Sequence, residues 1–75
     1  MNFRQLKAFD TVMRVGSITG AAKALHVSQP SVTRLVRELE AHLGFALFIR
    51  RGRGIAATVE ARRFHQAVES AFLNI

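Results

Sequence analysis

Apolar residues recur every three or four positions in the first quarter of the chain, with charged residues between them. This pattern predicts an amphipathic helix over residues 2–15, ended by Gly16. Ser17 can cap a second, alanine-rich helix. The apolar positions of the two helices are Phe3, Leu6, Phe9, Val12 and Met13, then Ile18, Ala21, Ala22 and Leu25.

A connection of only three residues, 26–28, joins the second helix to a third. Because the connection is so short, we expect Val27 to fill the core between the helices. Ser28 is a good N-cap, and Pro30 is tolerated in a first helical turn. Gly44 is placed to end the helix. The inward stripe of this helix consists of Val32, Leu35, Val36, Leu39 and Leu43.

The following segment predicts a small β-hairpin with a basic tip. Residues 47–49 are apolar, residues 50–54 read Arg-Arg-Gly-Arg-Gly, and residues 55–57 return as a second strand. Thr58 then caps a last helix whose apolar stripe reaches the end of the sequence. We therefore expect a mainly α winged helix-turn-helix over residues 1–57, with three helices and a two-stranded wing. Residues 58–75 would begin a linker helix of a longer protein.

Composition narrows the class of partner. The 75 residues suit a single domain, and eleven Lys and Arg against five Asp and Glu give a net charge of +6. This balance favours a polyanion such as nucleic acid. The chain has no cysteine, which excludes disulfides. No apolar run approaches the roughly 18 residues of a membrane span and no secretory segment is visible, so we expect a cytoplasmic protein without a membrane partner.

Two helices around a tight turn form a helix-turn-helix, whose second helix enters the major groove of DNA. Arginine can bond bidentately to guanine there, and glutamine to adenine. A polar helix face is also often simply solvated, and that alternative remains open. The outer-face residues expected to read bases are Gln29, Pro30, Ser31, Thr33 and Arg34.

The basic tip of the predicted hairpin can also be interpreted either as a DNA contact or as a solvated surface. Arg53 stands between two glycines, and we expect it to enter a minor groove, with Arg50 or Arg51 on phosphates. The alternative is a turn kept soluble by its charge.

Chemistry other than binding finds little support. The three histidines, His26, His42 and His65, lie on different elements at separations that match no metal-ligand spacing. We expect them at the surface or at helix ends, and we expect no metal, no cofactor and no enzymatic activity. Arg34 and Glu38, four residues apart, should interact.

The last apolar stripe can pack on the domain's own core or against a second copy. We favour a homodimer, because a terminal helix seldom exposes so many large apolar groups and a two-fold dimer presents two recognition helices. The alternative from another functional class is a protein-interaction module whose basic face and terminal apolar stripe dock an acidic partner or another helix. The predicted dimer stripe consists of Phe64, Val68, Phe72 and Ile75.

From Phe3 to Ile75, the chain resembles the LysR-type transcriptional regulators. The segments that carry the resemblance are Gln5-Leu6-Lys7-Ala8-Phe9, Gly16-Ser17-Ile18-Thr19, Ala21-Ala22-Lys23-Ala24-Leu25, Ser28-Gln29-Pro30-Ser31-Val32-Thr33-Arg34, Leu39-Glu40, Leu43-Gly44 and Leu47-Phe48-Ile49-Arg50. One departure lies at the start of the linker helix, where the family commonly has Leu-Thr-x-Ala-Gly and this chain has Ala57-Thr58-Val59-Glu60-Ala61.

The resemblance implies bacterial transcription regulation by binding an interrupted inverted repeat in a double-stranded DNA operator. It implies a homodimer, or a tetramer of the longer protein, and a small-molecule effector bound by a C-terminal domain absent from this chain. Operator bases would be read by the outer-face residues above, and the minor groove by Arg53. The expected phosphate contacts are Ser17, Thr19, Ser28, Arg37, Arg50 and Arg51.

Overall fold

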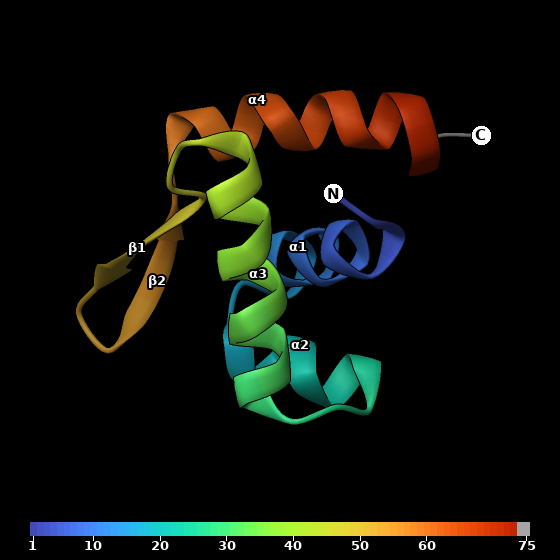
Figure 1. Ribbon diagram of the computed structural model, residues 1–75. Coiled ribbons are helices and arrows are strands. Elements are labelled where there is room, and N and C mark those ends of the chain that lie inside the picture. The colour runs from blue at the N-terminus through green and yellow to red at the C-terminus, as the bar shows by residue number, and fades with distance from the viewer. Residues whose placement is uncertain (74–75) are drawn as a thin grey trace.

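The computed structural model describes residues 1–73 as a helical domain with one projecting hairpin (Figure 1). Within these residues, no helix has the length and apolar character needed to cross a membrane. The elements in chain order are α1 (Phe3–Val15), α2 (Ile18–Leu25), α3 (Gln29–Leu43), β1 (Phe48–Arg51), β2 (Gly54–Ala57), α4 (Val59–Val68) and the π-helical turn η1 (Glu69–Leu73).

Side-chain caps start the helices where the sequence predicted. The oxygens of Ser17, Ser28 and Thr58 accept hydrogen bonds from the backbone N–H three residues later, at 2.9, 3.2 and 3.0 Å. This satisfies one otherwise unpaired donor of each first turn. Gly16 and Gly44 end α1 and α3 with φ of 87° and 84°, left-handed values that glycine adopts without steric cost. The predicted helix ends are therefore confirmed.

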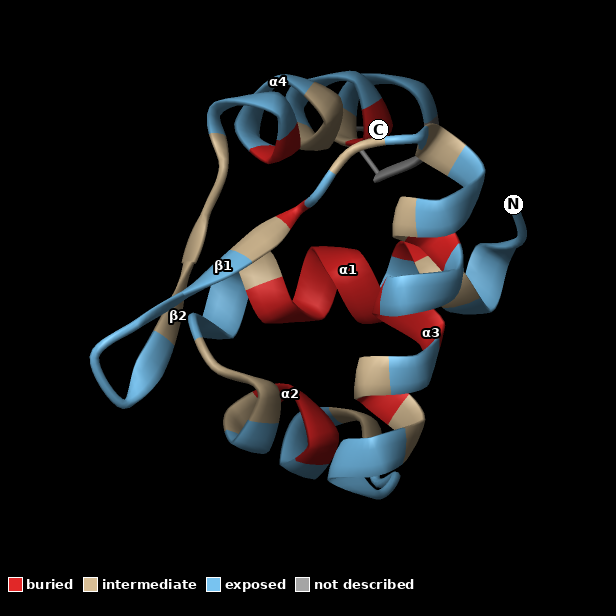
Figure 2. Ribbon diagram, turned by 60° about the vertical axis from the view of Figure 1, so that its left-hand side comes forward, coloured by how far each residue is buried: buried red, intermediate tan, exposed pale blue. Residues whose placement is uncertain are grey.

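The core forms around α1, whose residues 8–12 are buried between the other helices (Figure 2). Phe9 is fully buried, and its ring centroid lies 5.9 Å from that of Phe48 and 5.4 Å from that of Phe64. These contacts join α1 to the first strand and to α4. The remaining large core side chains come mainly from the apolar stripes of the helices.

The hairpin, which we call the wing (residues 48–57), is a two-stranded antiparallel sheet. Phe48 pairs with Ala57 at its base, and Arg51 pairs with Gly54 at its far end. The sequence predicted a turn over residues 50–54. In the structure, Arg50 and Arg51 belong to β1 and Gly54 to β2, so only residues 52 and 53 form the turn. Gly52 has φ of 59°, a left-handed value that such a two-residue hairpin turn requires.

Two predicted core positions are wrong. Val27 is 39% exposed and Phe3 is 64% exposed. The turn reverses through His26, whose left-handed φ of 58° leaves Val27 outside the helix contact. Phe3 is the first residue of α1, and the buried face of that helix begins one turn later, at Leu6.

The predicted dimer stripe also needs correction. Val68 is only 2% exposed, and Phe64 packs against the core. The Val68 side chain is occupied within the domain and is unavailable to a second copy, whereas Phe64 packs against the core and stays partly exposed. The side chain of Phe72 and the whole of Ile75 lie outside the described residues.

A polar cluster that the sequence did not reveal ties α1 to α4, and we call it the α1–α4 clasp (Asp10, Arg14, His65 and Glu69). Asp10 is 2% exposed, and its carboxylate accepts hydrogen bonds from Arg14 Nε at 3.0 and 3.1 Å and from His65 Nε2 at 2.8 Å. Arg14 also reaches Glu69, with 3.3 Å between Nη2 and Oε2. His65 was expected at the surface or at a helix end, and it lies in the last turn of α4 with a side chain that is only 14% exposed.

Candidate nucleic-acid interface

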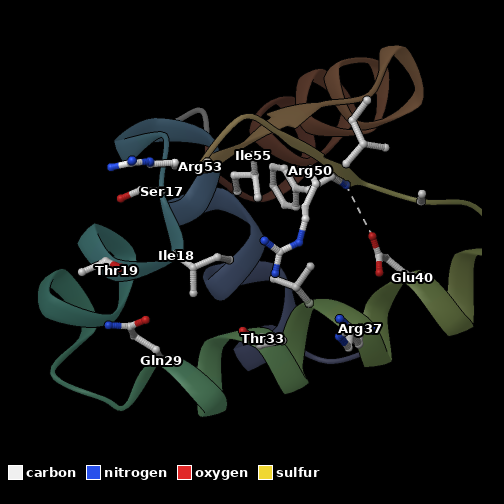
Figure 3. A pocket seen from close by; sticks show the side chains of 15 residues that line it. Ser17, Ile18, Thr19, Gln29, Thr33, Arg37, Glu40, Arg50, Arg53 and Ile55 are labelled. Carbon is white, nitrogen blue, oxygen red and sulfur yellow. Dashed lines mark hydrogen bonds between the residues drawn. The ribbon is translucent and has the colours of Figure 1, made fainter.

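A groove lies between the start of α2, the outer face of α3 and the wing (Figure 3), and we call it the interface groove. Three separate elements contribute its polar side chains, so the tertiary fold is what assembles it. The polar residues that line it are Ser17, Thr19, Gln29, Thr33, Arg37, Glu40, Arg50 and Arg53.

One wall of the interface groove is the N-terminus of α2. The Ser17 hydroxyl caps this helix through the N–H of Gly20, and Thr19 follows in the first turn. The remaining N–H groups of a first helical turn have no partner within their helix, and they carry the positive end of the helix dipole. This wall therefore favours an anion such as a phosphate.

The outer face of α3 presents four of the five predicted base-reading residues along one exposed surface. Gln29, Pro30, Thr33 and Arg34 line this surface together with Arg37, Glu38 and Ala41.

Ser31, the fifth predicted residue, is placed differently. It is half-buried, and its Oγ lies 2.9 Å from the Oγ of Ser28. Neither serine lines the interface groove or the outer surface of α3. The Ser28 hydroxyl caps the helix, and the Ser31 hydroxyl is hydrogen-bonded to it.

Arg34 interacts with Glu38 as predicted. Arg34 Nη1 lies 3.5 Å from Glu38 Oε2, and Gln5 Nε2 donates to the other carboxylate oxygen at 3.3 Å. Both charged side chains are about half exposed, so water screens the pair and it holds Arg34 only weakly. The guanidinium can therefore leave Glu38 for a stronger acceptor at small cost.

The wing brings two of its three arginines to the interface groove. Arg50 and Arg53 line it, and Figure 3 shows Arg50 reaching from β1 toward α3. Successive side chains of a strand point to opposite faces, so Arg51 faces away from Arg50. With Arg37, the groove has three arginines and one carboxylate, that of Glu40. Its lining therefore carries a net positive charge.

Glu40 is the residue of this site that sequence reasoning missed. Its Oε2 accepts hydrogen bonds from the backbone N–H of Leu47 at 2.7 Å and of Phe48 at 3.4 Å. No local sequence pattern predicts these bonds. Leu47 and Phe48 lie seven and eight residues after Glu40, and only the folded chain places them beside its carboxylate.

Among residues 1–73, the single candidate for metal ligation is part of the α1–α4 clasp. Ligand atoms of Asp10, His65 and Glu69 lie within 4.8 Å of one another. The carboxylate of Asp10, however, already accepts from Arg14 and His65. A guanidinium on the same carboxylate occupies the place of a cation, and the arrangement is typical of an ion-pair network that joins two helices.

Comparison with known proteins gives a family match over most of the chain. Residues 3–62 match the model of the bacterial regulatory helix-turn-helix proteins of the lysR family. The octopine catabolism/uptake operon regulatory protein OccR of Rhizobium meliloti is 40% identical over 75 residues, which is all of this chain and 25% of OccR. The HTH-type transcriptional regulator TcbR of Pseudomonas sp. strain P51 is 50% identical over 64 residues, 85% of this chain and 22% of TcbR. The chain thus spans about a quarter of the length of these relatives.

Solved structures match the fold equally well. The CbnR_DBD-DNA complex has a TM-score of 0.88 at 46% identity, covering 93% of this chain and 80% of that one. The BenM_DBD/benA site 1 DNA complex has a TM-score of 0.90 at 34% identity, covering 99% of this chain and 83% of that one. Both of these neighbours were crystallised with DNA.

Proposed function

Because this chain belongs to the LysR family of bacterial regulatory helix-turn-helix proteins, we propose that it binds double-stranded DNA and serves transcription regulation. The observation that carries the proposal is the interface groove, where the start of α2, the outer face of α3 and the wing converge with three arginines. The DNA complexes of similar domains support it. A basic groove flanked by an exposed helix is the form that recognition of a duplex requires.

In the proposed mechanism, α3 is the recognition helix and lies in the major groove. Gln29 is at its N-terminus and Arg34 lies about one turn further along, both on the exposed outer face. Arg34 exchanges its weak contact with Glu38 for a guanine edge, and Gln29 is matched to adenine. Each good bidentate pair contributes about 1 to 3 kcal/mol of discrimination.

Phosphates are held by the two walls of the interface groove. Ser17 and Thr19 present a helix N-terminus and hydroxyls to one phosphate, while Arg37 and Arg50 supply charge from α3 and β1. Arg53, at the tip of the wing, enters the neighbouring minor groove. These contacts fix the register of α3 and carry no base sequence themselves.

We further propose that the protein acts as a homodimer on an interrupted inverted repeat in the bacterial cytoplasm. Since Val68 belongs to the domain's own core and Phe64 packs against it, we expect the dimer contact to use the exposed side of α4, where Ala67 lies. A small-molecule effector domain belongs to the longer protein, and this chain needs no cofactor of its own. Sedimentation of the chain extended to the length of its relatives tests the dimer, which a monomer at micromolar concentration would contradict.

The decisive experiment selects bound sequences from random duplex DNA and then compares variants on the selected site. Arg34→Ala should weaken binding by about 1 to 3 kcal/mol and relax the preference at one base pair. Arg50→Ala should weaken all duplexes alike. Arg4→Ala, which removes an exposed arginine from the first turn of α1, is the matched charge control and should change affinity least.

Salt dependence separates this proposal from the alternative of a module that docks an acidic protein. Each neutralised phosphate contributes about −0.9 to the slope of log affinity against log salt. We expect a steep slope that becomes shallower by about one unit in Arg50→Ala. A flat slope, or no selected sequence, would exclude specific DNA binding and favour the protein partner.

A further inference from the structure

The base of the wing is held on two sides by polar contacts. On one side, the Thr58 hydroxyl donates to the carbonyl of Ala46 at 2.8 Å and lies 3.3 Å from that of Leu47, while the Thr58 N–H donates to Leu47 at 3.0 Å. On the other side, Glu40 accepts the N–H groups of Leu47 and Phe48. The backbone at residues 46–48 is therefore fixed between α3 and the start of α4.

By charge alone, a carboxylate at the position of Glu40 is unfavourable for binding DNA. It lines the interface groove with Arg37 and Arg50, and the dashed line in Figure 3 marks its bond to the wing. A carboxylate beside a bound phosphate chain repels it, so electrostatics alone predicts that DNA binding would improve without this residue. Its hydrogen bonds point to a geometric contribution that outweighs this repulsion.

We propose that Glu40 is a positioning residue for DNA binding, which sets the wing at a fixed angle to the recognition helix α3. The inference rests on the proposed function, because it assumes that α3 and the wing engage the same duplex. The carboxylate joins α3 to the base of the wing through the backbone N–H of Leu47, directly before the first strand, and that of Phe48, its first residue, so the link is independent of wing side chains. The bond to Leu47, at 2.7 Å, has the short length of a strong charge-assisted hydrogen bond, and the bond to Phe48, at 3.4 Å, is longer and weaker.

The link matters because the wing is small and its connection to α3 is short. β1 begins at residue 48, only five residues after α3 ends at Leu43. With Glu40 in place, Arg50 and Arg53 are presented to the duplex in one geometry together with α3. Without it, the wing samples other angles, and ordering it on DNA costs entropy that reduces affinity.

The test compares four forms of the 75-residue chain on a duplex selected by the wild-type chain from random DNA. Glu40→Gln keeps the shape and loses the charge, whereas Glu40→Asp keeps the charge and shortens the reach. Both should bind about fivefold more weakly or worse, since a hydrogen bond to a charged group is affected in each. The control Glu60→Gln, an exposed acid in the first turn of α4, should bind as well as wild type or slightly better.

Chemical footprints separate positioning from general loss of stability. At saturating protein, both Glu40 variants should still protect guanine N7 in the major groove, beneath α3, and should lose protection of the minor groove against hydroxyl radicals at the wing. Circular dichroism at the assay temperature identifies the folded fraction, to which affinities are normalised. Equal loss of both protections would overturn the proposal, as would tighter binding by Glu40→Gln.

The wild-type chain distinguishes failure of this inference from failure of the proposed function. If wild type selects no duplex, the proposed DNA binding is refuted. If wild type binds but gives no protection at the wing, the proposed minor-groove contact of the wing is refuted. If wild type gives both protections and the two Glu40 variants match it in affinity and footprint, the function stands and the positioning role is refuted.

Discussion

The buried contact between Asp10 and His65 should be one of the main polar contributions to stability. Asp10 is almost fully buried in α1, and His65 Nε2 donates to its Oδ1 at 2.8 Å from α4. A carboxylate can only accept, so the imidazole proton lies on Nε2 in this bond. Replacing Asp10 with Ala removes the acceptor from His65, whose side chain is 14% exposed.

The stability lost in Asp10→Ala can be worked out from how exposed His65 and Arg14, the two partners of Asp10, are. A hydrogen bond to a charged group contributes about 1.5 to 3 kcal/mol. The Arg14–Asp10 pair adds little, because the Arg14 side chain is 56% exposed and such helical pairs contribute about 0.3 to 0.5 kcal/mol. Asp10→Ala should therefore lower the free energy of unfolding by about 2 to 3.5 kcal/mol. In a domain of this size the midpoint temperature falls by about 10 to 20 °C.

A double-mutant cycle isolates the contact, with unfolding followed by circular dichroism. His65→Ala also loses an edge-to-face contact with Phe9, whose ring centroid lies 5.6 Å from that of His65, and the cycle subtracts this loss. The coupling free energy should be about 1.5 to 3 kcal/mol. Gln66→Ala, at an exposed position of α4, should change stability by less than about 0.5 kcal/mol. A coupling below about 0.5 kcal/mol would refute the assignment of the clasp as a stabilising contact.

Three further substitutions test the core, a helix end and the turn. Leu39→Ala, at a fully buried position, should lower the free energy of unfolding by about 3 to 5 kcal/mol in urea denaturation, and a loss below 1 kcal/mol would contradict its place in the core. Gly16→Ala meets no atom within 4 Å but must adopt φ of 87°, so the backbone alone should cost about 1 to 2 kcal/mol in the same assay. Val27→Ser should cost less than about 1 kcal/mol because Val27 is 39% exposed, and a thermal shift equivalent to more than 2 kcal/mol would return Val27 to the core.

Local features of the sequence were enough to predict the elements and most of their ends. Ser17, Ser28 and Thr58 cap helices through their own side chains, and Gly16 and Gly44 end helices through their own backbone freedom. Each capping signal involves residues no more than about four positions apart, so it can be recognised in a single sequence without knowledge of the fold. The polar outer face of α3 was predictable for the same reason, since it follows from the position of the apolar stripe.

Contacts between distant segments were not predictable in this way. Asp10 lies four residues after Leu6 and three before Met13, a spacing that places it on the buried face of α1, but periodicity treats an acid as an interruption of the stripe. Its partner His65 lies 55 residues away. Arg14, four residues after Asp10, was a local sign that the carboxylate had a charged neighbour. The exposure of Val27 likewise depends on how the turn at His26 reverses the chain.

The residues that would contact DNA and the residues that position the helices and the wing differ in how freely they can be substituted, and this affects how base specificity can evolve. Residues that would touch DNA, such as Gln29 and Arg34, lie on an exposed face and can be exchanged with little effect on folding. Residues that place the elements, such as Asp10 and Glu40, are tied to distant partners, and changing them moves whole elements. Base preference can therefore drift through α3 while the angle between α3 and the wing stays constant. Substitution of Glu40 would weaken the minor-groove contacts of the wing without altering the bases that α3 prefers.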